Sequence, residues 1–166
     1  MRRFAMTVIA PAYLFVSMVA QADTVTISRS IPFAADSGAS ENVKRECKFE
    51  TRLPEYIRKQ AKRGLKVVVT EEPLENVTGK VLFLETTNVF APGGGGYSGS
   101  KSAIVTGELK EDGEVIASVT ARRRTLVGMT PGTCSMLKRI AKKLGEDIAT
   151  WLREPTMNAR LGDIKD

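Results

Sequence analysis

The stretch 132–155, GTCSMLKRIAKKLGEDIATWLREP, carries the strongest structural pattern in the chain. Its apolar residues recur at helical spacing and predict one amphipathic helix with a continuous apolar stripe. The stripe consists of Leu137, Ile140, Ala141, Leu144, Ile148, Trp151 and Leu152. Thr133 or Ser135 can cap the first turn, and Pro155 is expected to end the helix because proline cannot continue the backbone ladder. We expect this helix to pack on the core and to organise the rest of the chain.

The first 22 residues have the pattern of a secretory signal peptide. Arg2 and Arg3 precede a mostly apolar run over 4–19, and Ala20-Gln21-Ala22 matches an Ala-x-Ala cleavage site. The alternative is a retained membrane anchor, which is disfavoured because the run is short against the roughly 20 residues of a membrane span. We therefore expect residues 1–22 to be removed, leaving a periplasmic or secreted protein with no stable membrane span.

The remaining chain suits one domain over 23–155, followed by a flexible C-terminal tail over 156–166. The formal net charge of +6 falls to +4 when Arg2 and Arg3 are removed. A mildly basic chain favours anionic partners. Export disfavours nucleic acid as one of those partners.

Two cysteines, Cys47 and Cys134, are the only ones in the chain. In an exported protein such a pair is typical of a disulfide, which would close a long loop and remove both thiols as nucleophiles. The alternative is two free buried thiols. The chain has no histidine, which excludes Ser–His–Asp triads and histidine metal sites.

Five stretches have the pattern of β-strands: 24–31, 65–70, 81–90, 103–109 and 114–127. Asp112-Gly113 predicts a hairpin between the last two. Between the first two strands, a helix is predicted to start near Thr51, with Pro54 in its first turn, and to end at Gly64. The alternative is one longer helix from Val43 that is kinked at Pro54.

The strand over 81–90 is apolar on both faces, which is typical of a central strand that is covered on both sides or lies at an interface. Its two expected faces are Val81, Phe83 and Val89, and Leu82, Leu84 and Phe90. The chain is therefore predicted to be an α+β domain with a mixed sheet of about five strands and two helices on one face. The element order is β-α-β-β-β-β-α, with the first strand–helix–strand unit parallel and the later strands antiparallel.

Three sequence segments resemble small uncharacterised secreted proteins of Gram-negative bacteria. They are Val43–Cys47 with Leu53-Pro54, Gly94–Gly99, and Gly132–Ser135 with Trp151-Leu152. The arrangement of elements also resembles the amino-terminal domain of the periplasmic protein TolB and curli-secretion-type domains of outer-membrane proteins. The resemblance implies an envelope compartment and a disulfide, and it implies no activity.

The glycine-rich loop over 92–102 matches a dinucleotide fingerprint by letters only. That fingerprint needs a helix after the glycines, to place amide groups on a pyrophosphate, and here a strand is predicted to follow. Lys101 is also one residue too late for a phosphate loop. We expect no cofactor and no metal. The loop is either a plain connection or a binding loop with Tyr97 and Lys101 as contacts.

Arg122 and Arg124 are predicted to point from one face of their strand and could grip a phosphate or carboxylate. The hairpin brings them towards Lys101 and Tyr97, and these four residues form the candidate anion-binding site. Arg123 is in register with the apolar face, which would bury its charge unless it is paired or lies at the sheet margin, and Glu85 is a possible partner. The alternative is that the charges only keep an exposed sheet edge from pairing with another chain.

No pair of side chains has the spacing of a catalytic pair, so no catalytic residue is assigned and we favour a protein that is not an enzyme. The expected function is a non-catalytic periplasmic or secreted protein that binds an envelope protein or an anionic envelope component. One alternative is a binding module for an anionic glycan or lipid head group. Another is a weak hydrolase that uses carboxylates or a serine, such as Ser100 with Lys101 or Ser135 with Lys138.

Overall fold

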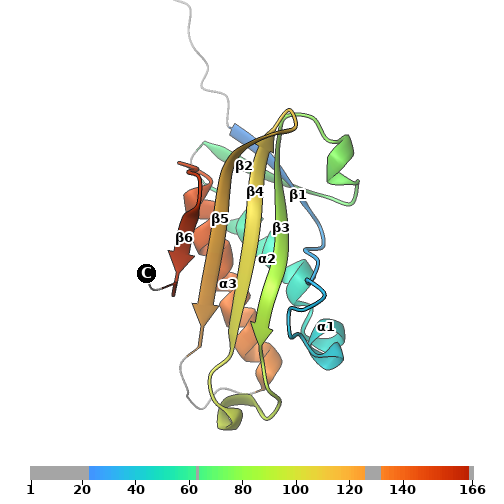
Figure 1. The fold of residues 1–166 in the computed structure, drawn as a ribbon, viewed down its shortest axis with the longest axis vertical. Helices are drawn as coiled ribbons and strands as arrows, with labels where there is room; N and C mark the ends of the chain where they lie inside the picture. Colours follow the sequence, from blue (N-terminus) through green and yellow to red (C-terminus); the bar gives the residue numbers. More distant parts are fainter. Residues whose placement is uncertain (1–22, 63, 126–131, 165–166) are drawn as a thin grey trace, which may run out of the picture.

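The protein is a single α+β domain built on one six-stranded sheet (Figure 1). A computed structural model describes residues 23–62, 64–125 and 132–164, so the predicted signal peptide over 1–22 lies outside the described residues. The elements are β1 (Asp23–Ser28), α1 (Glu41–Cys47), α2 (Phe49–Gln60), β2 (Leu65–Thr70), η1 (Leu74–Asn76), β3 (Lys80–Phe90), η2 (Gly95–Ser98), β4 (Ser102–Glu111), β5 (Glu114–Arg124), α3 (Thr133–Trp151) and β6 (Ala159–Gly162).

The sheet has the strand order β2-β1-β3-β4-β5-β6. Strand β1 is parallel to β2 and to β3, and β3, β4 and β5 form an antiparallel meander. This confirms the predicted parallel unit, the antiparallel strands that follow it, and the hairpin at Asp112-Gly113, where both residues have positive φ. Strand β3 is central, as its double apolar pattern indicated.

The sixth strand corrects the prediction of a flexible tail over 156–166. Ala159–Gly162 pair in parallel with Val119–Arg122 of β5. Four residues with a weak alternation do not form a strand alone, and the open edge of β5 supplies the hydrogen-bonding partners. Ala159–Gly162 are therefore part of the sheet and not of a flexible tail.

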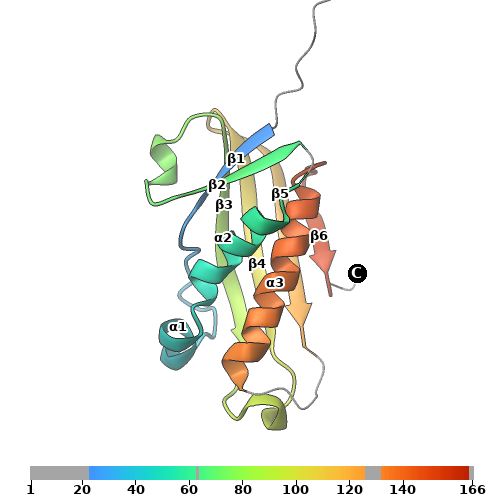
Figure 2. The ribbon, with the colours of Figure 1, turned by 180° about the vertical axis from the view of Figure 1, so that it is seen from behind.

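Helices α2 and α3 cover one face of the sheet, and the opposite face is left open (Figure 2). The stripe of α3 is buried as predicted. Cys47 at the end of α1 is bonded to Cys134 in the first turn of α3, which confirms the disulfide. The helix ends at Trp151, four residues before Pro155, and its N-cap is Gly132 without a capping side chain. Among the described residues, no helix is both long and apolar enough to cross a membrane.

The helical region after β1 differs from both sequence interpretations. It breaks at Lys48, whose φ of 51° is left-handed, rather than at Pro54. Helix α2 starts at Phe49, two residues before the predicted start near Thr51, and Pro54 lies buried inside it. The break turns α1 away from α2, so that Cys47 can reach Cys134.

A β-bulge between Thr86 and Asn88 corrects the predicted faces of β3. One extra residue reverses the alternation, so Val89 is buried on the same side as Leu82 and Leu84, not on the side of Val81 and Phe83. Phe90 is 58% exposed. The helix-covered face of the sheet therefore keeps one continuous apolar surface through the bulge.

Candidate anion-binding groove

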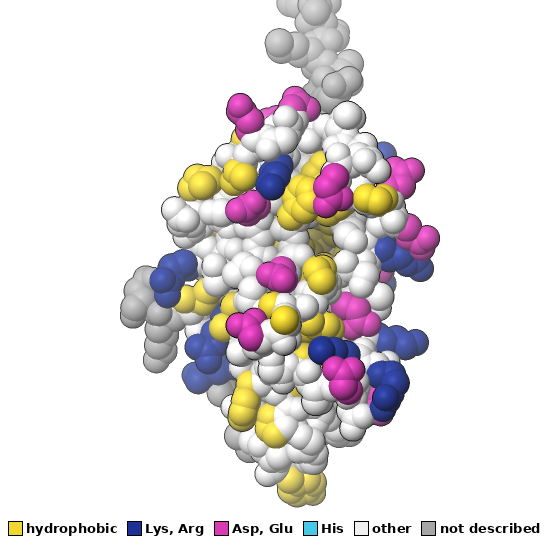
Figure 3. All heavy atoms as spheres, turned by 45° about the vertical axis from the view of Figure 1, so that its right-hand side comes forward, with side chains coloured by type: hydrophobic (Ala, Val, Ile, Leu, Met, Phe, Trp, Pro, Cys, Tyr) yellow, Lys and Arg dark blue, Asp and Glu magenta, His cyan; other side chains and the backbone are white. Residues whose placement is uncertain are grey.

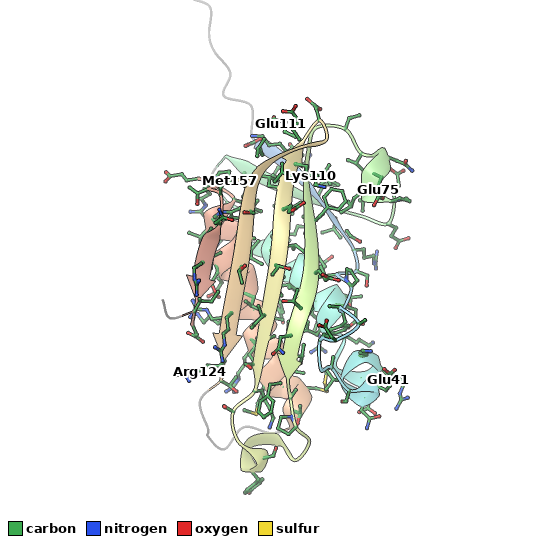
Figure 4. All side chains as sticks on the ribbon, in the orientation of Figure 1. Glu41, Glu75, Lys110, Glu111, Arg124 and Met157 are labelled. Atoms are coloured by element: carbon green, nitrogen blue, oxygen red, sulfur yellow. A yellow bond between two sulfur atoms is a disulfide. The ribbon has the colours of Figure 1, made fainter. Side chains whose placement is uncertain are left out.

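The open face of the sheet is formed by alternate residues of β3, β4, β5 and β6, on the side that faces the viewer in Figure 1. On β5, Ala117, Val119 and Ala121 are buried against the helices. Because side chains alternate along a strand, Arg122 and Arg124 project from the opposite, open face. This confirms the predicted common direction of the two arginines. Figure 4 shows Arg124 at the lower end of β5, far from Lys110 at the other end of the meander.

A hollow of about 730 Å³ lies on this face between β4, β5 and the C-terminal segment. Strand β4 contributes Ile104, which is paired with Arg122. Strand β6 contributes Arg160, which is paired with Thr120. We call this hollow the arginine groove, and its lining is Ile104, Thr120, Arg122, Arg124, Arg160, Gly162, Asp163 and Ile164.

Arg122 and Arg124 have unused hydrogen-bonding capacity. Within residues 23–62, 64–125 and 132–164, no carboxylate forms an ion pair with either side chain. The Nε atom of Arg122 is buried and has no hydrogen-bond partner there. A buried donor without a partner is costly.

Arg123, between the two groove arginines, is fully engaged on the other side of β5. Its Nε and Nη2 donate to the two carboxylate oxygens of Asp147 on α3, at 2.6 and 2.7 Å. Its Nη1 donates to Asp163 at 3.1 Å. These contacts, led by Asp147, raise the pKa of the Arg123 guanidinium above its ordinary value. The prediction that Arg123 needs a partner is right, but the partner is not Glu85, which is exposed on the other side of the sheet.

Asp163 is the carboxylate at the border of the groove, and both of its oxygens are occupied. One accepts from Arg123 and the other accepts from the Arg124 backbone amide at 2.8 Å. Its own amide donates to the Arg122 carbonyl at 2.7 Å. Asp163 therefore fixes the C-terminal segment beside β5 and does not neutralise the Arg122 side chain.

Lys101 and Tyr97, the other two predicted site residues, lie outside the groove. Lys101 is 0% exposed, and its Nζ donates to Ser98 Oγ at 2.8 Å and to the Gly99 carbonyl at 3.1 Å. Burial lowers the pKa of the Lys101 ammonium. Tyr97 lies on η2 and is 101% exposed, so its ring extends into solvent. The structure brings Arg122 and Arg124 together and places Lys101 and Tyr97 at the glycine loop.

Sequence reasoning missed the groove residues of the C-terminal segment, Arg160, Gly162 and Asp163. The available signal was the alternation of the half-buried Ala159 and Leu161 with Arg160, which is too short to predict a strand. Since β6 covers β5 up to Arg122, this part of β5 is not a free edge. The interpretation that the arginines only block edge pairing therefore loses its basis at Arg122. The described residues contain no cluster of three or more potential metal ligands.

No protein-family model and no curated protein sequence matches the chain. Among solved structures, the PelC dodecamer from Paraburkholderia phytofirmans is similar with 18% identity and a TM-score of 0.43, covering 75% of this chain and 89% of that chain. A putative neuraminyllactose-binding hemagglutinin homolog from Helicobacter pylori has 9% identity and a TM-score of 0.40, over 79% and 81%. A minor lipoprotein from Acinetobacter baumannii has 14% identity and a TM-score of 0.42, over 81% and 95%. Because these scores are below 0.5, no function follows from them, and the resemblance to TolB is not confirmed.

Proposed function

We propose that the protein is an extracytoplasmic binding protein that recognises an anionic envelope glycan through the arginine groove. The observation that carries the proposal is the pair Arg122 and Arg124, which face one hollow and have no carboxylate partner within the described ranges. The predicted signal peptide and the Cys47–Cys134 disulfide support an extracytoplasmic location.

The chemistry of the groove favours a carboxylate, sulfate or phosphate. A guanidinium is planar and always charged, and it binds such groups through two parallel hydrogen bonds. Arg122 and Arg124 are two residues apart on one face of a strand, so their like charges repel until an anion lies between them. The groove has no nucleophile paired with a base, so this face is expected to bind and not to catalyse.

A second hollow of about 510 Å³ favours a glycan over a lipid. It lies on the same face and shares Thr120 with the arginine groove. Its lining is mainly polar and includes Glu85, Thr106, Ser118 and Asn158. Figure 3 shows hydrophobic side chains only in small patches between charged ones on the neighbouring side of the molecule. Hydroxyl and amide groups in line with an anion site suit a chain of sugars with one acidic residue, whereas acyl chains need an apolar surface.

Titration calorimetry at low salt with a short oligouronate tests the proposal, with the methyl-esterified oligomer as the uncharged ligand. The first variant is Arg122→Glu with Arg124→Glu. The matched control is Lys138→Glu with Lys142→Glu, which makes the same charge change on the exposed side of α3. Circular dichroism establishes that each variant is folded.

We expect the parent protein and the Lys138/Lys142 variant to bind only the charged oligomer, with affinity that falls as salt rises. The Arg122/Arg124 variant should not bind. Equal binding of the charged and esterified oligomers, or unchanged binding by the arginine variant, would overturn the proposal. Binding to anionic lipid vesicles but not to any oligouronate would show that the anion belongs to a lipid head group.

A further inference from the structure

Lys101 is a buried amine that forms no ion pair with a carboxylate of the described residues. Lysines are almost never fully buried unless they are paired with a carboxylate. Here the two neighbours of Nζ are neutral, the Ser98 hydroxyl and the Gly99 carbonyl. Nothing in the arginine groove uses this amine, because Lys101 lies on the buried side of the sheet with Ala103 and Val105.

The titratable and charged groups near Lys101 that the structure describes supply no carboxylate partner for its amine. Helix η2 carries Tyr97, whose ring lies in solvent. The first turn of α3 carries Cys134, which is in the disulfide. On β5, Arg123 is paired with Asp147 and Asp163, and Arg124 projects from the open face. Burial lowers the pKa of Lys101. At a given pH, a larger fraction of this amine is therefore neutral than in an ordinary lysine.

Ser98 is the side chain next to this amine, and it is exposed. It ends η2, where its Oγ also donates to the Gly95 carbonyl at 3.1 Å. The hydroxyl also lies 3.3 Å from the Pro92 carbonyl as a donor, and it accepts from the buried Lys101 amine at 2.8 Å. An exposed residue therefore contacts a buried amine. The serine–lysine contact involves Ser98, and neither Ser100 nor Ser135 makes a hydrogen bond to a lysine among the described residues.

The loop that carries Ser98 is held in place from α3. The Thr133 hydroxyl donates to the Pro92 carbonyl at 3.2 Å and accepts from the Gly95 amide at 3.3 Å. Cys134, the next residue, is fixed to α1 by the disulfide. A nucleophile needs such a fixed position relative to its base, because a small misplacement costs much of the rate.

We propose that Ser98 and Lys101 form a serine–lysine nucleophile that takes an acyl group from an ester at the tip of the molecule. In the reactive state the Lys101 amine is neutral. As Ser98 Oγ attacks the ester carbonyl carbon, its proton passes to Nζ. The bond between that carbon and the leaving oxygen breaks, and Nζ returns the proton to the leaving alcohol. Water then attacks the carbonyl carbon of the Ser98 ester and gives a proton to the same amine. The bond between that carbon and Ser98 Oγ breaks, Nζ returns the proton to Oγ, and a carboxylic acid leaves.

The competing explanation is that Lys101 only braces the glycine loop by satisfying Ser98 and Gly99. The two explanations differ in reactivity. A brace that remains an ammonium donates to Ser98 and cannot accept its proton, so Ser98 would react no faster than Ser100. A base accelerates acylation by typically a hundredfold or more.

The experiment exposes the folded protein to p-nitrophenyl acetate between pH 7 and 10, follows p-nitrophenol release, and locates the acetyl group by peptide mass analysis. The variants are Ser98→Ala, Lys101→Met and, as the matched control, Ser100→Ala. Thermal melts establish that each variant is folded. Ser98→Ala removes the Lys101–Ser98 contact but keeps the Lys101–Gly99 contact, and its thermal melt shows whether the lost half of the brace matters for folding.

We expect acetylation of Ser98 in the parent protein and in Ser100→Ala, no burst of p-nitrophenol in Ser98→Ala, and a rate about a hundredfold lower in Lys101→Met. The rate in the parent should rise with pH as Lys101 loses its proton. Acetyl groups found only on other lysines, Tyr97 or Ser100 would overturn the proposal, as would equal acetylation of Ser98 in Lys101→Met.

Discussion

The amide of Ile31 donates to the carbonyl oxygen of Glu50 at 3.1 Å. In a regular helix this carbonyl would accept from the backbone amide of residue 54. Position 54 is a proline, which has no amide hydrogen. The chain after β1 therefore supplies the hydrogen bond that α2 lacks. This contact explains how a proline lies inside a helix without leaving a buried carbonyl unpaired.

Replacing Pro54 by alanine should change the free energy of unfolding by less than about 1 kcal/mol. Proline inside a helix usually costs about 3 kcal/mol relative to alanine, but here Glu50 is already satisfied by Ile31. The buried ring also contributes packing and restricts the unfolded chain. Urea unfolding measures the change. A gain near 3 kcal/mol would mean that Ile31 does not compensate for the missing donor.

Removing the disulfide with Cys47→Ala and Cys134→Ala should lower the free energy of unfolding substantially. The bridge spans a sequence separation of 87 residues, for which loop-closure entropy gives about 4–5 kcal/mol. Reduction of the parent protein should give a similar loss, measured by urea unfolding with and without reductant. A loss below about 1 kcal/mol in both experiments would contradict the entropic account.

The features that the sequence predicted correctly are those that a local pattern determines. The stripe on α3, the central position of β3 and the Asp112-Gly113 hairpin follow from periodicity and turn chemistry within short windows. The features it missed depend on distant partners. The break at Lys48 allows a bond to Cys134, the Thr86/Asn88 bulge is fixed by pairing with β4, and β6 exists because β5 offers an edge.

The candidate site divides in the same way. The alternation of side chains along a strand correctly predicts that Arg122 and Arg124 share one face. The same alternation predicts that Lys101 lies on the buried side with Ala103 and Val105. The sequence interpretation used proximity along the hairpin and overlooked that signal. The alternation around Arg160 is too short to predict a strand, and the place of Arg160 beside Thr120 depends on a strand pairing between residues 40 apart along the chain, as the Ser118–Asn158 contact beside it does.

Gly162→Ala should separate β6 from β5. Gly162 has a φ of 77°, and an added Cβ would collide with the Arg122 carbonyl and the Arg123 side chain. Gly113→Ala is the matched control, because Gly113 has a φ of 90° with open space around it. The control should lose about 1–2 kcal/mol from backbone strain, and Gly162→Ala should lose about 1–3 kcal/mol more from the collision.

Hydrogen exchange shows where the effect of Gly162→Ala falls. Amides of Ala159–Gly162 and of the facing part of β5 should lose protection, while those of the β3–β4 pair should keep it. Equal losses of stability in the two glycine variants would mean that the close approach to Arg122 contributes nothing.

Thr86→Val should stabilise the protein. Thr86 is 0% exposed, and its Oγ1 has no hydrogen-bond partner among the described residues. Valine has nearly the same shape without the hydroxyl, so the replacement removes a desolvation cost of about 1 kcal/mol or more. Thr106→Val, on the open face of β4, is the control and should change little. A loss of stability in Thr86→Val, measured by thermal unfolding, would imply that the hydroxyl is satisfied.

Lys101 should make stability rise with pH in the alkaline range. Burial lowers its pKa in the folded protein below the usual value of 10.5. Between the folded pKa and 10.5, the unfolded chain binds more protons at this position than the folded chain does. A rise in pH then favours the folded state. At pH values below this window, the buried ammonium lowers the free energy of unfolding. At pH values above it, the amine is neutral in both the folded and the unfolded chain.

The measurement is urea unfolding from pH 7 to pH 11 for the parent protein, Lys101→Met and the exposed control Lys142→Met. Lys80 acts in the opposite sense, because its hydrogen bond to Asp23 raises its pKa above 10.5, so its contribution is lost only at higher pH. All three proteins contain Lys80, and its effect therefore cancels in their differences. The parent should gain stability relative to Lys101→Met as pH rises towards 10.5. The Lys142→Met variant measures the effect of replacing a lysine that lies on the exposed side of α3. A constant difference from Lys101→Met would show that the amine at position 101 titrates alike in the folded and unfolded chains.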